Sequence, residues 1–193
     1  QAEEAAARLT EAGAGALTCK LVAMTTIGDQ ITDRRLIEAG GKGLFTRELD
    51  QALSERRAEI AAHSLKDVPA VLPDDQVLAA FLPREDPREA FLSPGAGSLM
   101  ELPKGALLGT ASLRRQAQAL RMRPDLQILA LRGNVQTRLR KLEAGEAHAT
   151  FLAAAGLARL GLSHLPACFV NLDEMKPAAG QGIVAIAALR DCD

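Results

Sequence analysis

Aromatic side chains are scarce in this sequence, which has five Phe and neither Tyr nor Trp among its 193 residues. Proteins that hold single-stranded nucleic acid stack the bases on aromatic rings, so the composition argues against that class. No apolar run approaches the roughly 18 residues that a membrane-spanning helix needs. We therefore expect a protein that binds neither nucleic acid nor a membrane.

Cysteine is scarce as well, since Cys19, Cys168 and Cys192 are widely separated in the chain. They form neither a disulfide framework nor a C-x-x-C pair, and the three histidines show no metal-ligand spacing. The composition thus predicts a reducing, cytoplasmic setting and no metal site. The chain begins at Gln1 with neither a Met nor a basic-then-apolar leader, so we expect that its first residues are missing.

The remaining composition is that of a globular protein, with 48% hydrophobic and 24% charged residues. Predicted strands, which are short β-rich runs, alternate with predicted helices, which have caps and amphipathic spacing. This alternation predicts an α/β fold with mostly parallel sheets covered on both faces. We expect helices at 1–12, 46–56, 112–122, 134–144 and 154–160, and strands at 17–27, 58–63, 77–82, 107–109, 126–131, 149–153 and 183–189.

Two breaks divide the chain into two predicted domains. Pro83–Pro87 is polar and stiff and indicates a crossing into the second domain, and Pro177–Gly182 indicates the return. We expect domain 1 to comprise residues 1–83 plus 181–193 and domain 2 to comprise residues 88–177. The polar, glycine-rich segment Gly28–Gly43 is predicted to be a mobile lid.

Positive charge is concentrated in one part of a chain whose net charge is −1. Residues 101–145 carry nine basic and three acidic side chains, and seven of the nine are Arg. Arg binds a carboxylate or a phosphate through two parallel hydrogen bonds. A single Arg here would belong to a solvated helix face, but the group as a whole indicates an anion site.

Candidate binding residues follow the predicted strands, because ligands of open parallel sheets bind at the carboxyl ends of the strands. Asp67 follows the strand at 58–63. Ser112 and Asn134 are predicted to cap helices whose free N–H groups attract anions. Near these caps lie Thr110, Arg114, Arg115, Arg132 and Arg138.

Three other functions were considered from the sequence, and two of them are excluded. No Ser or Thr follows Lys42 in Gly40–Gly43, so this is not a phosphate-binding loop of the P-loop type. His63, Ser64 and Asp67 lie too close in one loop to form a nucleophile–base triad. A non-catalytic, two-lobed anion-binding module stays open as an alternative. Asp67 argues against it, because an acid in a basic cleft would repel the carboxylate that such a module binds.

Short motifs of a single family occur in order along nearly the whole chain. They are GKGLF at 41–45, HSLKDVP at 63–69, REDPR at 84–88, GTASLRRQ at 109–116, LRGNV at 131–135, TRL at 137–139, AAGL at 154–157 and PAAGQG at 177–182. Together they resemble the porphobilinogen deaminase (hydroxymethylbilane synthase) family.

The resemblance implies two periplasmic-binding-protein-like (type II) α/β domains with a cleft between them, and a third, α+β domain that this chain lacks. It implies a monomeric, cytoplasmic transferase of tetrapyrrole and haem biosynthesis. Such an enzyme joins four porphobilinogen units head to tail, with release of ammonia, to give hydroxymethylbilane. The implied partners are porphobilinogen and the growing oligopyrrole chain, and the implied cofactor is a covalent dipyrromethane.

The resemblance also implies roles for individual residues. Asp67 would be the catalytic carboxylate, which stabilises the cationic pyrrole left by ammonia loss and shuttles protons. The acetate and propionate groups of the substrate suit the arginines. Implied contacts to substrate and cofactor are Gln1, Lys42, Ser64, Lys66, Thr110, Ser112, Arg114, Arg115, Arg132, Arg138 and Arg159.

The family holds its cofactor on a Cys of the third domain, in a Gly-Gly-Cys context. None of Cys19, Cys168 and Cys192 has that context, and the chain ends at Asp193, where the third domain would begin. We therefore expect this chain to carry no dipyrromethane, and we expect the fragment alone to be inactive.

Overall fold

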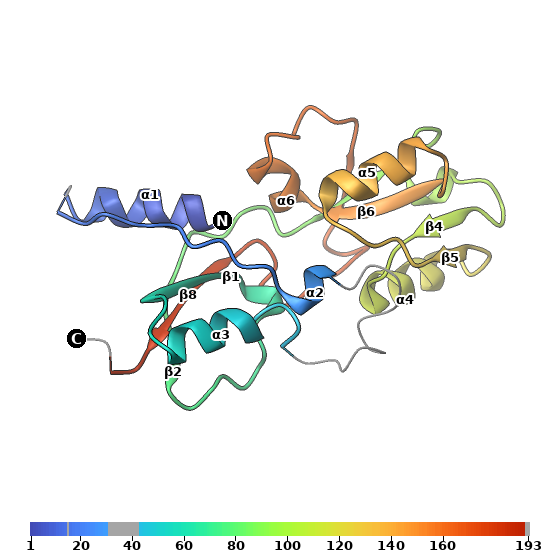
Figure 1. Ribbon diagram of the computed structural model, residues 1–193. Helices are drawn as coiled ribbons and strands as arrows, with labels where there is room; N and C mark the ends of the chain where they lie inside the picture. Colours follow the sequence, from blue (N-terminus) through green and yellow to red (C-terminus); the bar gives the residue numbers. More distant parts are fainter. Residues whose placement is uncertain (15, 31–42, 192–193) are drawn as a thin grey trace. The chain divides into compact units, whose positions relative to one another are not determined.

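The computed structural model describes residues 1–14, 16–30 and 43–191, and the chain forms two compact units (Figure 1). Unit 1 holds the described residues up to Arg84 and again from Ala179, and unit 2 holds Glu85–Ala178. The chain therefore crosses between the units twice. Within the described residues, none of the helices has the length and apolar character to cross a membrane.

Unit 1 is a three-stranded sheet with helices on both faces (Figure 1). The strand order is β1-β8-β2, and the central strand is antiparallel to both neighbours. A 3₁₀ turn, Leu65–Asp67, follows the first strand. The elements are α1 (Ala2–Ala12), α2 (Ile27–Gln30), α3 (Arg47–Ser54), β1 (Ile60–Ser64), β2 (Gln76–Phe81) and β8 (Val184–Leu189).

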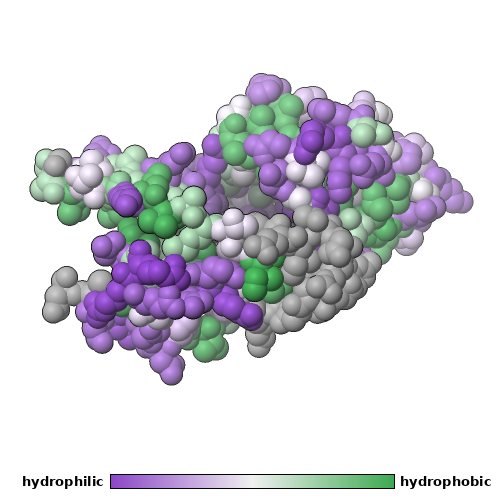
Figure 2. Space-filling view, viewed as in Figure 1, coloured by the Kyte–Doolittle hydropathy of each residue, from purple (hydrophilic) through white to green (hydrophobic). Residues whose placement is uncertain are grey.

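The two faces of this sheet are covered by different helices because successive strand residues point to opposite sides. On one face, Ala5 of α1 packs with Val184 and Ile186. On the other face, Leu53 of α3 packs with Ala61 and Ala187. Polar side chains line the outside of α3, and Figure 2 shows a hydrophilic surface there.

The prediction of a strand at Leu17–Ile27 is wrong. Residues 16–26 pair with no strand of the described chain, and α2 begins at Ile27. Leu17, Leu21 and Val22 are 52%, 51% and 53% exposed. The β-rich pattern is local, but a strand also needs a partner for its backbone hydrogen bonds, and that is a property of the whole fold.

Unit 2 is a five-stranded sheet with the order β5-β4-β6-β3-β7. The pairs of β4 with β5 and of β4 with β6 are parallel, whereas β3 is antiparallel to β6 and to β7. A 3₁₀ turn spans Leu99–Glu101. The elements are β3 (Glu89–Leu92), β4 (Leu107–Gly109), α4 (Leu113–Met122), β5 (Gln127–Leu129), α5 (Val135–Glu143), β6 (Ala149–Ala153), α6 (Ala154–Arg159) and β7 (Cys168–Val170).

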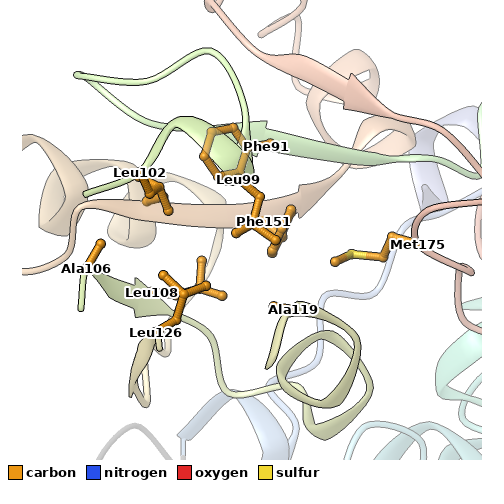
Figure 3. Close-up of a cluster of buried hydrophobic side chains, with 10 residues drawn as sticks. Phe91, Leu99, Leu102, Ala106, Leu108, Ala119, Leu126, Phe151 and Met175 are labelled. Atoms are coloured by element: carbon orange, nitrogen blue, oxygen red, sulfur yellow. The ribbon is translucent and has the colours of Figure 1, made fainter. Parts of the chain in front are cut away.

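Both faces of the second sheet are buried. Phe91 and Phe151 lie on the face covered by α4, with ring centroids 5.6 Å apart, and they pack with Leu108 and Ala119 (Figure 3). Leu152, the strand neighbour of Phe151, faces the other way and joins the cluster that α5 and α6 cover. The alternation fixes which side chains stand next to α4.

The α/β class is confirmed, but the sheets are mixed rather than mostly parallel. The return of the last strand to the sheet of unit 1 is also confirmed, and it supplies the antiparallel centre of that sheet. Two strands, β3 and β7, were not predicted from the sequence. Each is a run of only three or four residues, and antiparallel pairing brings them together through contacts distant in sequence.

Arg123 is a structural anchor at the amino ends of β4 and β5. Its Nε and Nη2 donate to Oδ1 and Oδ2 of Asp125, at 2.8 Å each. Its Nη1 also donates to the carbonyls of Leu99 and Leu102, at 3.1 Å each. The hydrogen bond from Arg123, and then that from the N–H of Gly105, holds the pKa of Asp125 far below its usual range.

The return segment passes close to the turn that follows β1. Gly180 has φ +69°, and a Cβ placed there would lie 2.7 Å from Cγ of Leu65. A Gly180→Ala substitution combines left-handed strain with overpacking and should lower the free energy of unfolding by about 2–4 kcal/mol. Urea unfolding measures the loss.

Gly43 of the same unit is the matched control. Its φ is +70°, but the atom nearest to an added Cβ is Oγ1 of Thr46, at 3.6 Å. Gly43→Ala should therefore cost only the strain, about 1–2 kcal/mol. Equal losses in the two variants would show that the contact with Leu65 does not constrain Gly180.

Candidate functional site

Two helix N-termini lie next to each other in unit 2. Because β4 and β5 are parallel neighbours, with Leu108 opposite Ile128, their carboxyl ends meet at one edge of the sheet. The loop after β4 leads into α4, and the loop after β5 leads into α5. Thr110 N donates to Leu129 O at 2.8 Å, which joins the two loops at their start.

The predicted caps are confirmed. The hydroxyl of Ser112 accepts from the N–H of Arg115 at 3.4 Å, and Oδ1 of Asn134 accepts from the N–H of Thr137 at 2.8 Å. Thr110 is buried, and its Oγ1 accepts from the N–H of Ser112 at 3.2 Å. Thr110 and Ser112 thus shape the first turn of α4.

A buried carboxylate lies beneath α4. Glu89 is fully buried at the start of β3, and its Oε2 accepts from Nε of Arg115 at 3.1 Å and from Nη2 at 2.6 Å. Nη1 of Arg115 donates to the carbonyl of Phe151 at 2.9 Å. Arg115 itself is 6% exposed, so its guanidinium is held in place on two neighbouring strands.

Arg114 uses the second oxygen of the same carboxylate. Its Nη2 pairs with Oε1 of Glu89, and its Nη1 donates to the carbonyl of Lys176 at 2.6 Å. Gln118, one turn further along α4, binds both backbone polar groups of Lys176: its Nε2 donates to Lys176 O at 3.0 Å, and its Oε1 accepts from Lys176 N at 2.7 Å.

Opposing effects act on the pKa of Glu89. Burial is the largest and raises the pKa, because it disfavours the charged form. The charge and hydrogen bonds of Arg115, followed by those of Arg114, lower the pKa. Together they outweigh the effect of burial, so the pKa of Glu89 lies below its ordinary value. Glu89 is therefore ionised at neutral pH. Glu89 was not among the predicted site residues, and its signal in the sequence is an acidic side chain directly before the apolar residues of β3.

Arg132 and Arg138 complete a group of like charges. Arg132 is 7% exposed in the loop after β5, and Nε of Arg138 donates to the carbonyl of Gly133 at 2.8 Å. Burial, followed by the positive charges of Arg115 and Arg132, lowers the pKa of Arg138 to about 10. We call Arg115, Arg132 and Arg138 the arginine cluster. An anion at this cluster would relieve its repulsion.

Asp67 lies in unit 1, in the 3₁₀ turn that follows β1, where its side chain is exposed. The turn is fixed to the return segment, since Leu65 N donates to Ile183 O at 3.0 Å. At the end of β1, Oγ of Ser64 accepts from Nε2 of Gln1 at 2.6 Å. Lys66 is exposed beside Asp67.

His63 stands apart from these polar groups. It is buried, and burial lowers its pKa, although the negative charge of Asp50 opposes the shift. Because His63 and Ser64 are neighbours on a strand, their side chains point to opposite faces of the sheet. They do not form a nucleophile–base pair.

Of the other expected site residues, Arg159 is partly buried at the end of α6. Lys42 lies outside the described residues, as does the predicted lid apart from its ends. Within residues 1–14, 16–30 and 43–191, no three His, Cys, Asp or Glu side chains are grouped to hold a metal ion.

Comparison with known proteins agrees with these features. Residues 1–193 match a family model described as porphobilinogen deaminase, dipyromethane cofactor binding domain. The porphobilinogen deaminase of Caulobacter vibrioides is 60% identical over 166 residues, which are 86% of this chain and 52% of that protein. That of Nitrobacter hamburgensis is 58% identical over 168 residues, which are 87% of this chain and 53% of that protein.

The enzyme of Paracoccus denitrificans is 50% identical over 187 residues, which are 96% of this chain and 60% of that protein. The chain thus spans about half the length of the curated relatives it matches. Arg114 and Arg115 of α4, and Arg132 and Arg138 near the start of α5, lie within motifs that favoured this family on sequence alone.

Two solved structures share the fold at low sequence identity. A putative methionine-binding lipoprotein of Bacillus subtilis has a TM-score of 0.54 at 14% identity, covering 98% of this chain and 78% of its own. The periplasmic VFT2 domain of BvgS from Bordetella pertussis has a TM-score of 0.52 at 13% identity, covering 99% and 72%. These matches support the expected type II periplasmic-binding-protein-like fold. With the family model covering the whole chain, this chain belongs to the porphobilinogen deaminase family.

Proposed function

We propose that this chain provides the two α/β domains of a hydroxymethylbilane synthase. The reaction joins four porphobilinogen units head to tail and releases ammonia at each step. The arginine cluster carries the proposal, because each porphobilinogen bears an acetate and a propionate and the growing chain is a polycarboxylate. Partly buried guanidinium groups that repel one another are suited to such a ligand.

The residues of unit 2 also fit the cofactor that the matched family model names. A dipyrromethane derived from this substrate is a polycarboxylate too, and we propose that Arg115, Arg132 and Arg138 hold its carboxylates. Chemically, a dipyrromethane supplies an electron-rich pyrrole carbon that can attack a cationic pyrrole. The capped N-terminus of α4, with Thr110 and Ser112, adds neutral donors to the same edge of the sheet.

We propose Asp67 as the acid–base group. Loss of ammonia from porphobilinogen leaves a cationic pyrrole, and a carboxylate near the pyrrole N–H stabilises that charge and accepts a proton. Asp67 is exposed and sits on a turn fixed by the return segment, so it is both accessible and positioned. The other proposed contacts to substrate and cofactor are Gln1, Lys42, Ser64 and Lys66, with Arg114 and Arg159 as further carboxylate ligands.

A non-catalytic anion-binding module is the less favoured function. The solved structures with this fold include binding proteins, but their low identity supports the fold alone. The matched relatives are named as an enzyme at 50–60% identity. We further propose a cytoplasmic monomer that binds neither nucleic acid nor a membrane, and light scattering of the full-length protein tests the monomer.

The Asp67→Asn substitution tests the acid–base role. The variant keeps the size of the side chain and removes its charge, so the full-length enzyme should fold normally. Turnover of porphobilinogen should fall by roughly a hundredfold or more, as is typical when an acid–base group is lost. The assay follows hydroxymethylbilane formation in protein whose melting temperature matches the wild type.

Asp74→Asn is the matched control in the same unit. Asp74 is exposed as well. Its hydrogen bond with Nε of Arg190, at 2.9 Å, is accepted by the backbone carbonyl and does not involve the carboxylate. Its substitution should leave turnover unchanged. Near-normal turnover in Asp67→Asn would remove Asp67 from the reaction.

An Arg138→Lys substitution tests the arginine cluster. Lysine keeps the positive charge but has no fork for bidentate binding, so the KM for porphobilinogen should rise at least ~10-fold. Arg140→Lys, two residues further along α5 and exposed, should leave KM unchanged. Equal KM values for the two variants in steady-state assays would contradict carboxylate binding at Arg138.

A further inference from the structure

We propose that Glu89 is a positioning residue, whose carboxylate sets the guanidinium groups of Arg114 and Arg115 in the geometry that receives the carboxylates of the ligand. The inference rests on the proposed function of the arginine cluster. Glu89 itself would touch neither the substrate nor the reacting atoms. It acts through the two arginines.

The position of Glu89 on the sheet makes it a rigid support. As the first residue of β3, it lies opposite Ala153 of β6 and Val170 of β7, so its backbone is fixed by strands on both sides. Its side chain is fully buried. Each carboxylate oxygen serves one arginine: Oε1 pairs with Arg114 and Oε2 with Arg115.

Arg115 is fixed at two further points. Its Nη1 reaches the carbonyl of Phe151, and its own N–H is bonded to the cap residue Ser112. Nε and Nη2 are both directed at Glu89. The side chain is thereby ordered before any ligand arrives, so binding does not have to restrict its rotamers.

One carboxylate cannot neutralise the arginines around it. Glu89 faces both Arg114 and Arg115, so one negative charge is set against two positive charges. Glu89 therefore orders the site without removing its attraction for an anion. A carboxylate with a single arginine partner would orient that arginine and cancel its charge.

The alternative is that Glu89 only stabilises the fold. Unit 2 contains a reference for such a role, the pair of Arg123 with Asp125, which has comparable distances. That pair lies at the amino ends of β4 and β5, at the edge opposite the arginine cluster. Comparing variants of Glu89 and of Asp125 therefore distinguishes a loss of ion-pair stability from a loss of positioning at the proposed anion site.

The test compares Glu89→Asp with Asp125→Glu in the full-length enzyme. Each variant keeps the negative charge and changes the side chain by one methylene. We measure the melting temperature, the fraction of protein that carries dipyrromethane by intact-mass spectrometry, and kcat and KM for porphobilinogen per loaded molecule. In Glu89→Asp the shorter side chain cannot reach both guanidinium groups.

We expect Glu89→Asp to load less than half as much cofactor as the wild type and to raise KM at least tenfold, with kcat changed less than threefold. Asp125→Glu should lower the melting temperature and leave loading and KM unchanged. If Glu89→Asp lowers the melting temperature alone, the positioning role is overturned. A wild type that neither loads cofactor nor turns over porphobilinogen would instead overturn the proposed function.

A second measurement keeps the proposal testable if Glu89→Asp does not fold. In the unliganded wild type, ¹⁵N relaxation of the Arg115 Nε–H group should give an order parameter near that of rigid backbone, about 0.85. The same group of the exposed Arg121 is the internal control and should be flexible, below about 0.6. A flexible Arg115 would overturn the proposal whatever the variants show.

Discussion

The ion pairs of Glu89 with α4 are the interaction on which the proposed anion site of unit 2 depends. Removing a carboxylate from water costs several kcal/mol, and this cost is offset only when charged partners with good geometry surround it. Glu89 has two such partners, and both come from the first turn of α4. Glu89 can therefore be buried in its ionised form only if α4 takes this position on the sheet. The helix must lie where its arginines reach the carboxylate.

Further positive charge lies at the same edge of the sheet. The parallel pairing of β4 and β5 brings two helix N-termini side by side, and their N–H groups already favour anions. Arg132 and Arg138 add charge that Glu89 does not neutralise, and the pKa of Arg138 falls because of burial and of its neighbours. The folded protein carries this repulsion as part of the proposed binding site.

Local features of the sequence predicted much of this site. The caps Ser112 and Asn134, the alternation of strands and helices from β4 to α6, and the concentration of arginines could each be predicted from a few neighbouring residues. Pairing distant in sequence could not be read in this way. The residues at 17–27 have a strand pattern but no partner, and Glu89 acquires its role only when β3 is placed beside β6.

The same dependence on distant residues governs the turn that carries Asp67. β8 lies between β1 and β2, so unit 1 is completed by chain that returns more than a hundred residues later. The N–H of Leu65 is bonded to Ile183, and Gly180 leaves no room for a side chain against Leu65. Asp67 thus owes its position to the return segment as much as to the strand before it. A motif of seven residues around Asp67 identifies the turn, but the packing of the returning chain holds it in place.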